Sequence, residues 1–446
     1  MDRLLFRRVL LLSLCVLLVT APIIMSVEAN GNIYIRADGT VDGTNKIQRN
    51  GNVYTFTDDI FDSIVVEKDD VVIDGAGYGL QGTGIGTGIN LMGRTNVTVK
   101  NIEISDFFYG IYLNFSLNNS LSSNNVRGNF CGIYLSASSN NTIIGNNITK
   151  NDSSGVWFRG SSNNNIKENR IIENGQDGIW LSTSSDDNRV LGNTIRTNEY
   201  GIRLDDYSNN MLRNNDFRDN GCNFGVFGSL LPEFIQDIDE SNTVNGNPIY
   251  YWVNRQDMTV PLDAGYVALV NCSGITIKNL NLSSNGQGLL VAYTTESSII
   301  QNNITNNIHG IYLCGSSNNT VTGNNITKNL ANGIYLYYSQ NNRFFHNNFM
   351  SNTNQVYDVG APSNIWDSEV EGNHWSNYEN RYPNATELDS SGIWNTPYVL
   401  DGNNQDNYPL VNAIPEFPSW VILPLLLVAT LLIIFYKKRL PKTSSN

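Results

Sequence analysis

The hydrophobic pattern of this chain is a repeat in which a glycine, an aliphatic residue, usually an aromatic residue and a second apolar residue return at a nearly constant interval. The glycine-to-glycine steps are 22 or 23 residues within each run. The repeated quartets are Gly110–Leu113, Gly132–Leu135, Gly155–Phe158, Gly178–Leu181, Gly201–Leu204, Gly288–Val291, Gly310–Leu313 and Gly333–Leu336. A fixed period of this length predicts stacked units, none of which buries its apolar face alone.

Two further apolar phrases recur inside each period, as in Ser139–Ile144 and Asn147–Ile148. Three short strands separated by Asn, Ser or Gly do not suit hairpins. They predict three sides of a coil whose strands pair in parallel with the coils above and below. Strand alternation places Ile111 and Leu113 inside and Tyr112 outside. Asparagines at the corners tolerate left-handed backbone and stack as amide ladders. The expected fold is an all-β parallel β-helix.

The prolines indicate where this coil is interrupted, because central strands exclude them. None occurs from residue 23 to 231 or from 262 to 361, whereas prolines stand at 232, 248 and 261 and from 362 onward. A shift of 178 residues lays Val97–Ile102 over Ile275–Leu280, so the phase is kept across the interruption. This fits either duplicated blocks or an insertion that leaves the coil in register. We expect two blocks, with Tyr250–Val253 forming separate strands on the flank.

The resulting division of the chain has seven parts. They are a signal peptide (1–29), an N-terminal cap (30–65), a first β-helical block (66–228), an excursion (229–264), a second block (265–360), a closing motif (361–413) and a terminal segment with a membrane helix and basic tail (414–446).

Both ends of the chain indicate export. Arg3, Arg7 and Arg8 precede the apolar stretch Val9–Thr20, and Ala29 suits cleavage of a secretory signal. The other end carries seventeen mostly apolar residues, Trp420–Tyr436, followed by basic residues. This length is at the short end of the spanning range, and the basic cluster favours a cytoplasmic tail. We expect a cell-surface protein anchored by its C-terminus.

The charge balance excludes one class of partner. The whole chain has 28 basic and 41 acidic residues. Without the three basic and two acidic residues of the leader and the four basic residues of the tail, 21 basic and 39 acidic residues remain, a net charge of about −18. Such a surface repels nucleic acid.

The cysteines and sequons suggest modifications of an exported protein. Cys222 and Cys272 flank the excursion and are candidates for a disulfide in an oxidising exterior. Cys131 and Cys314 stand beside quartets, where we expect small buried hydrophobes. Candidate glycosylation sites are Asn96, Asn114, Asn271, Asn281 and Asn384.

The coil phrase resembles the right-handed parallel β-helix repeats of NosD-type proteins, also called the carbohydrate-binding and sugar-hydrolysis repeat. The segments Ile33–Gly39 and Val72–Tyr78 resemble the opening of archaeal members. Gly372–Tyr378 and Thr396–Leu410 resemble the closing motif. The resemblance covers roughly residues 31–413 and implies a right-handed β-helix. An Asp-rich stretch typical of relatives is replaced here by Asp389–Asn395, which puts in doubt any cation held by that stretch.

The segment Ile414–Ser419, which precedes the apolar stretch, resembles the Pro-Glu-Phe sorting signal of archaeal surface proteins. That resemblance implies removal of the helix and attachment to lipid by an archaeosortase. Anchoring by the intact helix is the alternative.

The third quartet position is the candidate contact surface for a partner. It forms an outward stripe of aromatic residues and one arginine, with successive members about 4.8 Å apart. Its members are Tyr112, Tyr134, Trp157, Trp180, Arg203, Tyr312 and Tyr335. Aromatic faces in a row suit stacking on the sugar rings of a polysaccharide or envelope glycan. The alternative is that the rings stabilise the sheet through cross-strand packing.

Two further function classes are alternatives to glycan binding or a structural envelope role. A polysaccharide lyase or hydrolase needs clustered carboxylates, for which the candidates are Asp186, Asp187, Asp205 and Asp206, near Arg159 and Arg203. Solvated turn residues are the plainer interpretation, and fold alone does not confer activity.

Copper-site maturation is implied by the name-giving relatives. Soft-metal sites need clustered His, Met or Cys, whereas His309, His346 and His374 are scattered here. We expect no cofactor, no bound metal and a non-catalytic role.

Overall fold

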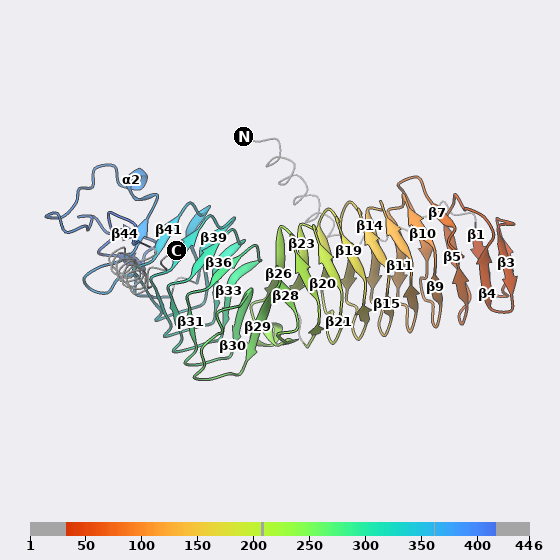
Figure 1. The fold of residues 1–446 in the computed structure, drawn as a ribbon, viewed down its shortest axis with the longest axis horizontal. Helices are drawn as coiled ribbons and strands as arrows, with labels where there is room; N and C mark the ends of the chain where they lie inside the picture. The colour runs from red at the N-terminus through yellow and green to blue at the C-terminus, as the bar shows by residue number, and fades with distance from the viewer. Residues whose placement is uncertain (1–32, 207–208, 361, 416–446) are drawn as a thin grey trace, which may run out of the picture.

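The computed structural model describes residues 33–206, 209–360 and 362–415 and shows an elongated coil of β-strands (Figure 1). Successive coils pair in parallel, as Ile111 with Ile133 and Ile133 with Val156. The predicted all-β solenoid of 22- to 23-residue coils is therefore confirmed.

The first block has three sides. One side is a ten-stranded sheet, here called the quartet sheet, which contains all the first-block quartets. Its order is β2 (Val41–Asp42), β1 (Ile33–Ile35), β5 (Ile64–Val66), β8 (Thr87–Asn90), β11 (Tyr109–Asn114), β14 (Cys131–Ser136), β17 (Val156–Arg159), β20 (Asp177–Ser182), β23 (Tyr200–Asp205) and β26 (Cys222–Phe227).

The second side of the first block is also ten-stranded. Its order is β27 (Asp237–Ile238), β24 (Met211–Arg213), β21 (Arg189–Leu191), β18 (Asn165–Lys167), β15 (Thr142–Ile144), β12 (Ser120–Ser122), β9 (Thr98–Lys100), β6 (Val72–Asp74), β4 (Val53–Phe56) and β3 (Ile47–Asn50).

The third side is part of a fourteen-stranded sheet that runs through both blocks, here called the shared sheet. Its order is β7 (Gly79–Gln81), β10 (Glu103–Ser105), β13 (Asn125–Arg127), β16 (Asn147–Thr149), β19 (Arg170–Ile172), β22 (Thr194–Arg196), β25 (Asp216–Arg218), β28 (Thr243–Val244), β29 (Asn247–Val253), β30 (Tyr266–Val270), β33 (Gln287–Ala292), β36 (His309–Cys314), β39 (Asn332–Tyr337) and β42 (Asn354–Val359).

Smaller elements complete the second block and its cap. They are β31 (Thr276–Lys278), β34 (Ser298–Ile300), β37 (Thr320–Thr322) and β40 (Arg343–Phe345) in one sheet; β32 (Asn281–Ser283), β35 (Asn303–Thr305), β38 (Asn325–Thr327), β41 (Asn348–Met350) and β43 (His374–Trp375) in another; the pair β44 (Tyr398–Val399) and β45 (Gln405–Asp406); the 3-10 helix η1 (Leu231–Phe234); and the short helix α2 (Tyr378–Arg381).

Buried asparagine ladders fix the corners between the sides. The Asn146 side chain accepts bonds from the backbone N–H and the amide of Asn124, at 2.9 and 3.0 Å. Its own amide donates to the Leu121 carbonyl (2.9 Å) and to Oδ1 of Asn169 (3.0 Å). Each ladder member thus satisfies polar backbone that the tight corner leaves unpaired. The predicted amide ladders are present.

The left-handed backbone belongs to the residue before each ladder asparagine. Gly145, Lys150 and Glu168 have φ values of 63°, 55° and 56°. The sequence analysis assigned the left-handed backbone and the amide ladder to the same asparagines. In the structure, an outer residue adopts the left-handed backbone, and the asparagine after it forms the ladder bonds.

The quartet glycine is required by close packing between coils. A Cβ on Gly178 would lie 2.6 Å from the Gly201 carbonyl oxygen, 2.7 Å from Cγ2 of Ile195 and 3.0 Å from Nδ2 of Asn198. The next coil and its ladder therefore occupy the space that any side chain would need.

The two blocks are joined by a hairpin that reverses the strand direction. Strand β28 is parallel to β25, but it pairs antiparallel with β29 through the turn at Asn245 and Gly246. Both turn residues have positive φ (50° and 87°), as an Asn-Gly hairpin requires. Strand β29 then pairs in parallel with β30, so every later strand of the shared sheet runs opposite to the earlier ones.

The second core lies on the other face of the shared sheet. Ala268 and Leu290 pack into the first-block core, whereas Leu269 and Leu289 belong to a separate second core. Because strand direction and interior face both reverse, the two blocks coil with the same hand. The quartet strands of the second block accordingly continue a sheet that contains no quartet in the first block.

This arrangement corrects the expectation for Tyr250–Val253. The segment does not lie on the flank, because β29 is a central strand between β28 and β30. Tyr251 and Trp252 point to opposite faces and are 6% and 7% exposed, so each face of the strand is covered by a core.

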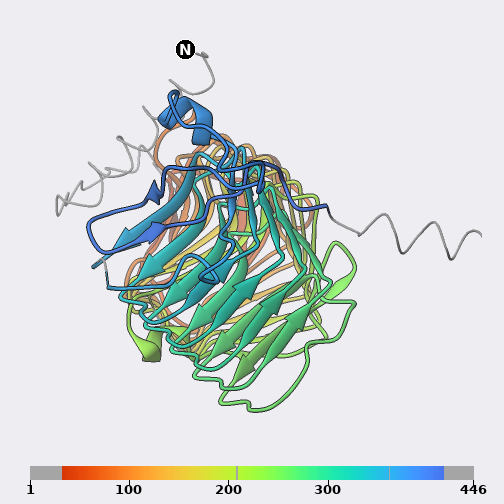
Figure 2. The same ribbon diagram turned by 90° about the vertical axis from the view of Figure 1, so that its left-hand side faces the viewer.

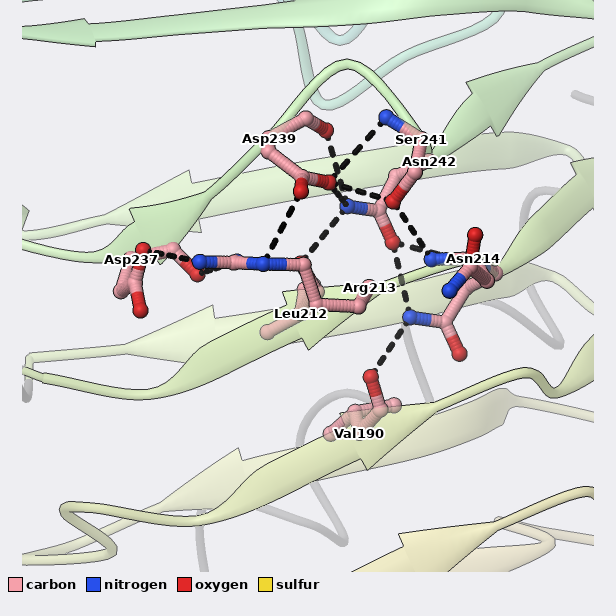
Figure 3. Close-up of polar contacts among 9 residues, drawn as sticks. Val190, Leu212, Arg213, Asn214, Asp237, Asp239, Ser241 and Asn242 are labelled. Atoms are coloured by element: carbon pink, nitrogen blue, oxygen red, sulfur yellow. Dashed lines mark hydrogen bonds and ion pairs between the residues drawn. The ribbon is translucent and has the colours of Figure 1, made fainter.

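Figure 3 shows how the chain before this hairpin is held to the last regular coil. The Arg213 guanidinium pairs with Asp237 at 2.5 Å and with Asp239 at 2.9 Å. The Asn242 side chain ends a ladder, since its Oδ1 accepts from the Asn215 amide at 2.8 Å. The excursion is therefore tied to the first block by charge and by the ladder.

The expected leader and the expected membrane span at 420–436 lie outside the described residues. In the part of the chain that the structure describes, no helix has the length and apolar character needed to cross a membrane.

Candidate functional site

The outer face of the quartet sheet carries three columns of side chains. The column before the glycine contains Tyr109, Cys131, Ser154, Asp177, Tyr200 and Cys222. The middle column is the predicted stripe Tyr112, Tyr134, Trp157, Trp180 and Arg203, followed by Gly225. The third contains Asn114, Ser136, Arg159, Ser182, Asp205 and Phe227.

The stripe is a continuous stack. The ring centroids of Tyr112 and Tyr134 lie 5.6 Å apart, those of Tyr134 and Trp157 lie 4.6 Å apart, and those of Trp157 and Trp180 lie 4.9 Å apart. The Arg203 guanidinium continues it, 5.1 Å from the Trp180 ring and 5.5 Å from the ring of Phe227. Register between the coils aligns these residues, as the sequence predicts.

The rings of the stack present their edges to solvent. The planes of Trp157 and Trp180 differ by 5°, so each ring covers a face of the next. The indole N–H of Trp157 donates to Ser182 at 3.0 Å, and that of Trp180 donates to Asp205 at 2.8 Å. The geometry therefore favours cross-strand packing over open sugar-stacking faces as the role of these two rings.

Polar groups on the same face remain available. The hydroxyls of Tyr109 and Tyr112 have no hydrogen-bond partner among the described residues, and Tyr112 is only half-buried. Arg159 is exposed and forms no ion pair with any described residue. The face thus offers two hydroxyl donors on β11 and a guanidinium donor on β17, two coils away.

Asp177 is the most unusual group of this face. It is 4% exposed, and Oδ1 has no partner, while Oδ2 accepts from Ser154 at 3.3 Å. Burial raises the pKa of Asp177 to about 7, against the opposing effect of Arg203. The sequence analysis did not single out Asp177. Its signal is in the sequence, because a residue with a polar group or a thiol stands directly before each quartet glycine of the first block.

Of the four predicted carboxylates, Asp205 alone lies on this face. It pairs with Nε of Arg203 at 2.9 Å and accepts the indole bond of Trp180. Asp187 and Asp206 are left-handed corner residues with φ of 56° and 58°, and Asp186 precedes the first of them. Burial raises the pKa of Asp206, with Glu233 and Asp205 adding to the shift. The structure does not gather the four carboxylates into one cluster.

The second-block part of the stripe is split by the junction. Tyr312 is 6% exposed, and its hydroxyl donates to the Gly228 carbonyl of the first block at 2.7 Å. Its expected exposure is wrong, because the reversed sheet turns this column towards the end of the first block. Tyr335 is half-buried and stacks on Tyr357 at 5.5 Å.

Comparison with known protein families shows which family this chain belongs to. The profile described as "Periplasmic copper-binding protein (NosD)" matches residues 44–248 and 253–380. The chain belongs to the NosD family. No curated protein sequence matches it.

Solved structures with some similarity to this NosD-family chain include carbohydrate-active proteins. The A-module of the mannuronan C-5 epimerase AlgE6 of Azotobacter vinelandii is 14% identical, with 70% of this chain and 87% of that chain covered and a TM-score of 0.32. The catalytic domain of a GH87 α-1,3-glucanase in complex with nigerose is 14% identical, with 72% and 63% covered and a TM-score of 0.33. Neither likeness is close enough to carry an argument about function.

The copper implied by the NosD family name does not fit the donor groups of the described residues. No group of three or more His, Cys, Asp or Glu side chains in this part of the chain has a metal-binding arrangement. The three histidines lie on separate elements. His309 contacts Asn332 at 3.0 Å, His346 pairs with Glu371 at 2.6 Å, and His374 belongs to β43 of the cap. Burial lowers the pKa of His309 to about 4.

The four cysteines of the described residues are buried and unpaired. Cys222 lies on the outer face of β26, whereas Sγ of Cys272 contacts the Trp252 carbonyl at 3.3 Å inside the second core. Burial raises the pKa of both thiols. The expected Cys222–Cys272 disulfide is absent from this structure, because the two side chains belong to different packing environments.

The candidate glycosylation sites are reachable to different degrees. Asn96, Asn271, Asn281 and Asn384 are exposed, and Asn114 is half-buried. Their modification stays a prediction.

Proposed function

We propose that this NosD-family protein binds an extended glycan along the outer face of the quartet sheet. The observation that carries the proposal is a group of donors beside the ring stack that have no protein partner among the described residues. These donors are the hydroxyls of Tyr109 and Tyr112, both on β11, and the guanidinium of Arg159, which lies two coils further along in the next column. A polymer of hydroxylated rings carries acceptors and donors along its whole length, so one chain can contact both coils.

The contacts would be edge-on hydrogen bonds rather than ring stacking, because neighbouring rings already cover the faces of Trp157. The stack would hold the rings of Tyr109 and Tyr112 rigid, which lowers the entropy lost when their hydroxyls bind the glycan. We place this glycan outside the cell, consistent with the exported, anchored chain that the leader and the apolar tail predict.

A glycan-cleaving activity is the second candidate, and Asp177 favours it. A carboxyl group with a pKa near 7 suits proton transfer at neutral pH. Both classes of cleavage, however, need a second group free to act, whereas Asp205 is engaged by Arg203 and Trp180. Binding therefore ranks before catalysis.

The test is a glycan array probed with the full-length protein and two variants, Tyr112→Phe and Arg159→Gln. Each removes a donor and leaves the ring stack in place, so binding of the recognised glycan should fall several-fold. Arg170→Gln is the matched control, because Arg170 is an exposed arginine of the shared sheet that bonds Asn147.

Equal binding by all four proteins would remove this face from consideration, and a protein that binds no glycan would favour the structural envelope role. Release of reducing ends from the bound glycan, lost in Asp177→Asn, would replace binding with catalysis.

A further inference from the structure

A cavity lies at the C-terminal end of the coil, away from the quartet sheet. Its volume is about 450 Å³, within the range of small-molecule sites. It is bounded by the edge strand β42 and by the α2 region of the cap, which sits on that end of the coil (Figure 2). Its polar lining includes Asn354, Gln355, Ser376, Asn377, Asn380 and Arg381.

Arg381 supplies a cation without a carboxylate partner among the described residues. Its guanidinium lies 4.8 Å from the ring of Tyr398 and 5.7 Å from that of Tyr382. Tyr398 is itself fixed, since it stacks on Trp375 at 4.2 Å with an interplanar angle of 1°. No Asp or Glu is among the residues that line the cavity. In a strongly acidic protein, an exposed guanidinium that pairs with no described carboxylate is available to an anion.

The remaining lining groups are left mainly as donors. Ser376 Oγ already accepts bonds from the Ser351 N–H and the Gln355 amide, both at 3.1 Å, which leaves its O–H to donate. Asn377 Oδ1 accepts from the Tyr398 hydroxyl at 3.1 Å, which leaves its NH₂ group. The Asn354 amide donates to Asn332 at 3.0 Å, which leaves one carbonyl acceptor.

We propose that this cavity binds a carboxylated sugar, of the uronic acid class, with the carboxylate on Arg381. The amide and hydroxyl groups of Asn354, Ser376 and Asn377 would bond the sugar hydroxyls, while the buried Tyr398 ring supports Arg381 from below. A small carboxylate such as acetate would fill only a small part of the cavity, whereas a sugar ring would fill more of it. This site is separate from the glycan face of the first block.

The test is calorimetric titration of the full-length protein with D-glucuronate and with D-glucose, which differ in the carboxylate alone. We expect glucuronate to bind at least about tenfold more tightly, as a charge-assisted contact implies. The difference should shrink with added salt. Arg381→Gln should abolish the preference, Arg381→Lys should restore part of it, and Arg170→Gln should leave it unchanged.

Three results would overturn the proposal: equal affinity for glucose and glucuronate, unchanged glucuronate binding in Arg381→Gln, or acetate binding as tightly as glucuronate. Asn377→Asp gives a second reading, because a carboxylate beside the site should repel glucuronate. Thermal unfolding checks that each variant is folded. Because Arg381 is remote from Tyr112 and Arg159, its variants should leave the array result intact, so the two proposals can fail independently.

Discussion

The indole rings of Trp157 and Trp180 lie 4.9 Å apart and within 5° of parallel, one coil above the other. This spacing is that of the strands themselves, so the rings extend the inter-coil contact from the backbone to the side chains. The ring stack therefore stabilises the first block, whatever else the face binds.

Replacing Trp180 should show how much the stack contributes. Trp180→Ala removes the ring between Trp157 and Arg203 and the bond to Asp205, so we expect a loss of about 2–3 kcal/mol in unfolding free energy. Trp180→Phe keeps a ring and should lose less than half as much. Denaturant unfolding followed by circular dichroism measures both. Similar losses for the two variants would mean that the indole N–H matters more than stacking.

The quartet glycine should be far less replaceable than a corner glycine. Gly178→Ala puts a Cβ 2.6 Å from the next coil's backbone, and such overpacking costs about 1–3 kcal/mol or more. Gly145→Ala meets no atom within 4 Å and adds only left-handed strain, about 1–2 kcal/mol. Melting temperatures of the two variants compare them directly. The explanation by close packing would be wrong if Gly145→Ala proved the more damaging.

A single ladder amide should carry a large share of local stability. Asn169 is 2% exposed and bonds Asn146, Ile143 and Asn193. Asn169→Ala leaves buried backbone groups unpaired, which costs about 3 kcal/mol or more. Glu168→Ala, at the exposed neighbouring position, should change stability by less than about 0.5 kcal/mol. Hydrogen exchange would locate the effect, with faster exchange expected at the Asn146 amide.

Because of Asp177, the free energy of unfolding should fall as the pH rises from about 4 to 7. Its folded pKa is about 7, above the ordinary 3.8, so the folded state holds a proton that the unfolded chain releases. This stability is full below about pH 4 and is lost as the pH rises through 7. Relative to wild type, Asp177→Asn should therefore gain stability between pH 4 and 7 and stay constant above. A melting-temperature difference independent of pH would refute the assignment.

The sequence determined the coil itself. The 22- to 23-residue step, inward Ile111 and Leu113, the outward ring column and the ladder-forming asparagines follow from local periodicity. These features are readable because each coil repeats the same short-range constraints on its neighbours. The Asn245-Gly246 turn was also readable, but it was overlooked among many similar pairs.

Only the tertiary structure decided how the two blocks meet. Periodicity keeps its phase across a 178-residue shift, yet it does not say which sheet edge a strand joins. The β28–β29 hairpin reverses the strands and moves the second core to the other face of the shared sheet. Tyr312 is buried as a result, whereas Tyr112 at the same repeat position stays half-exposed. The choice of edge is a contact between distant residues, and a repeat encodes only contacts between adjacent coils.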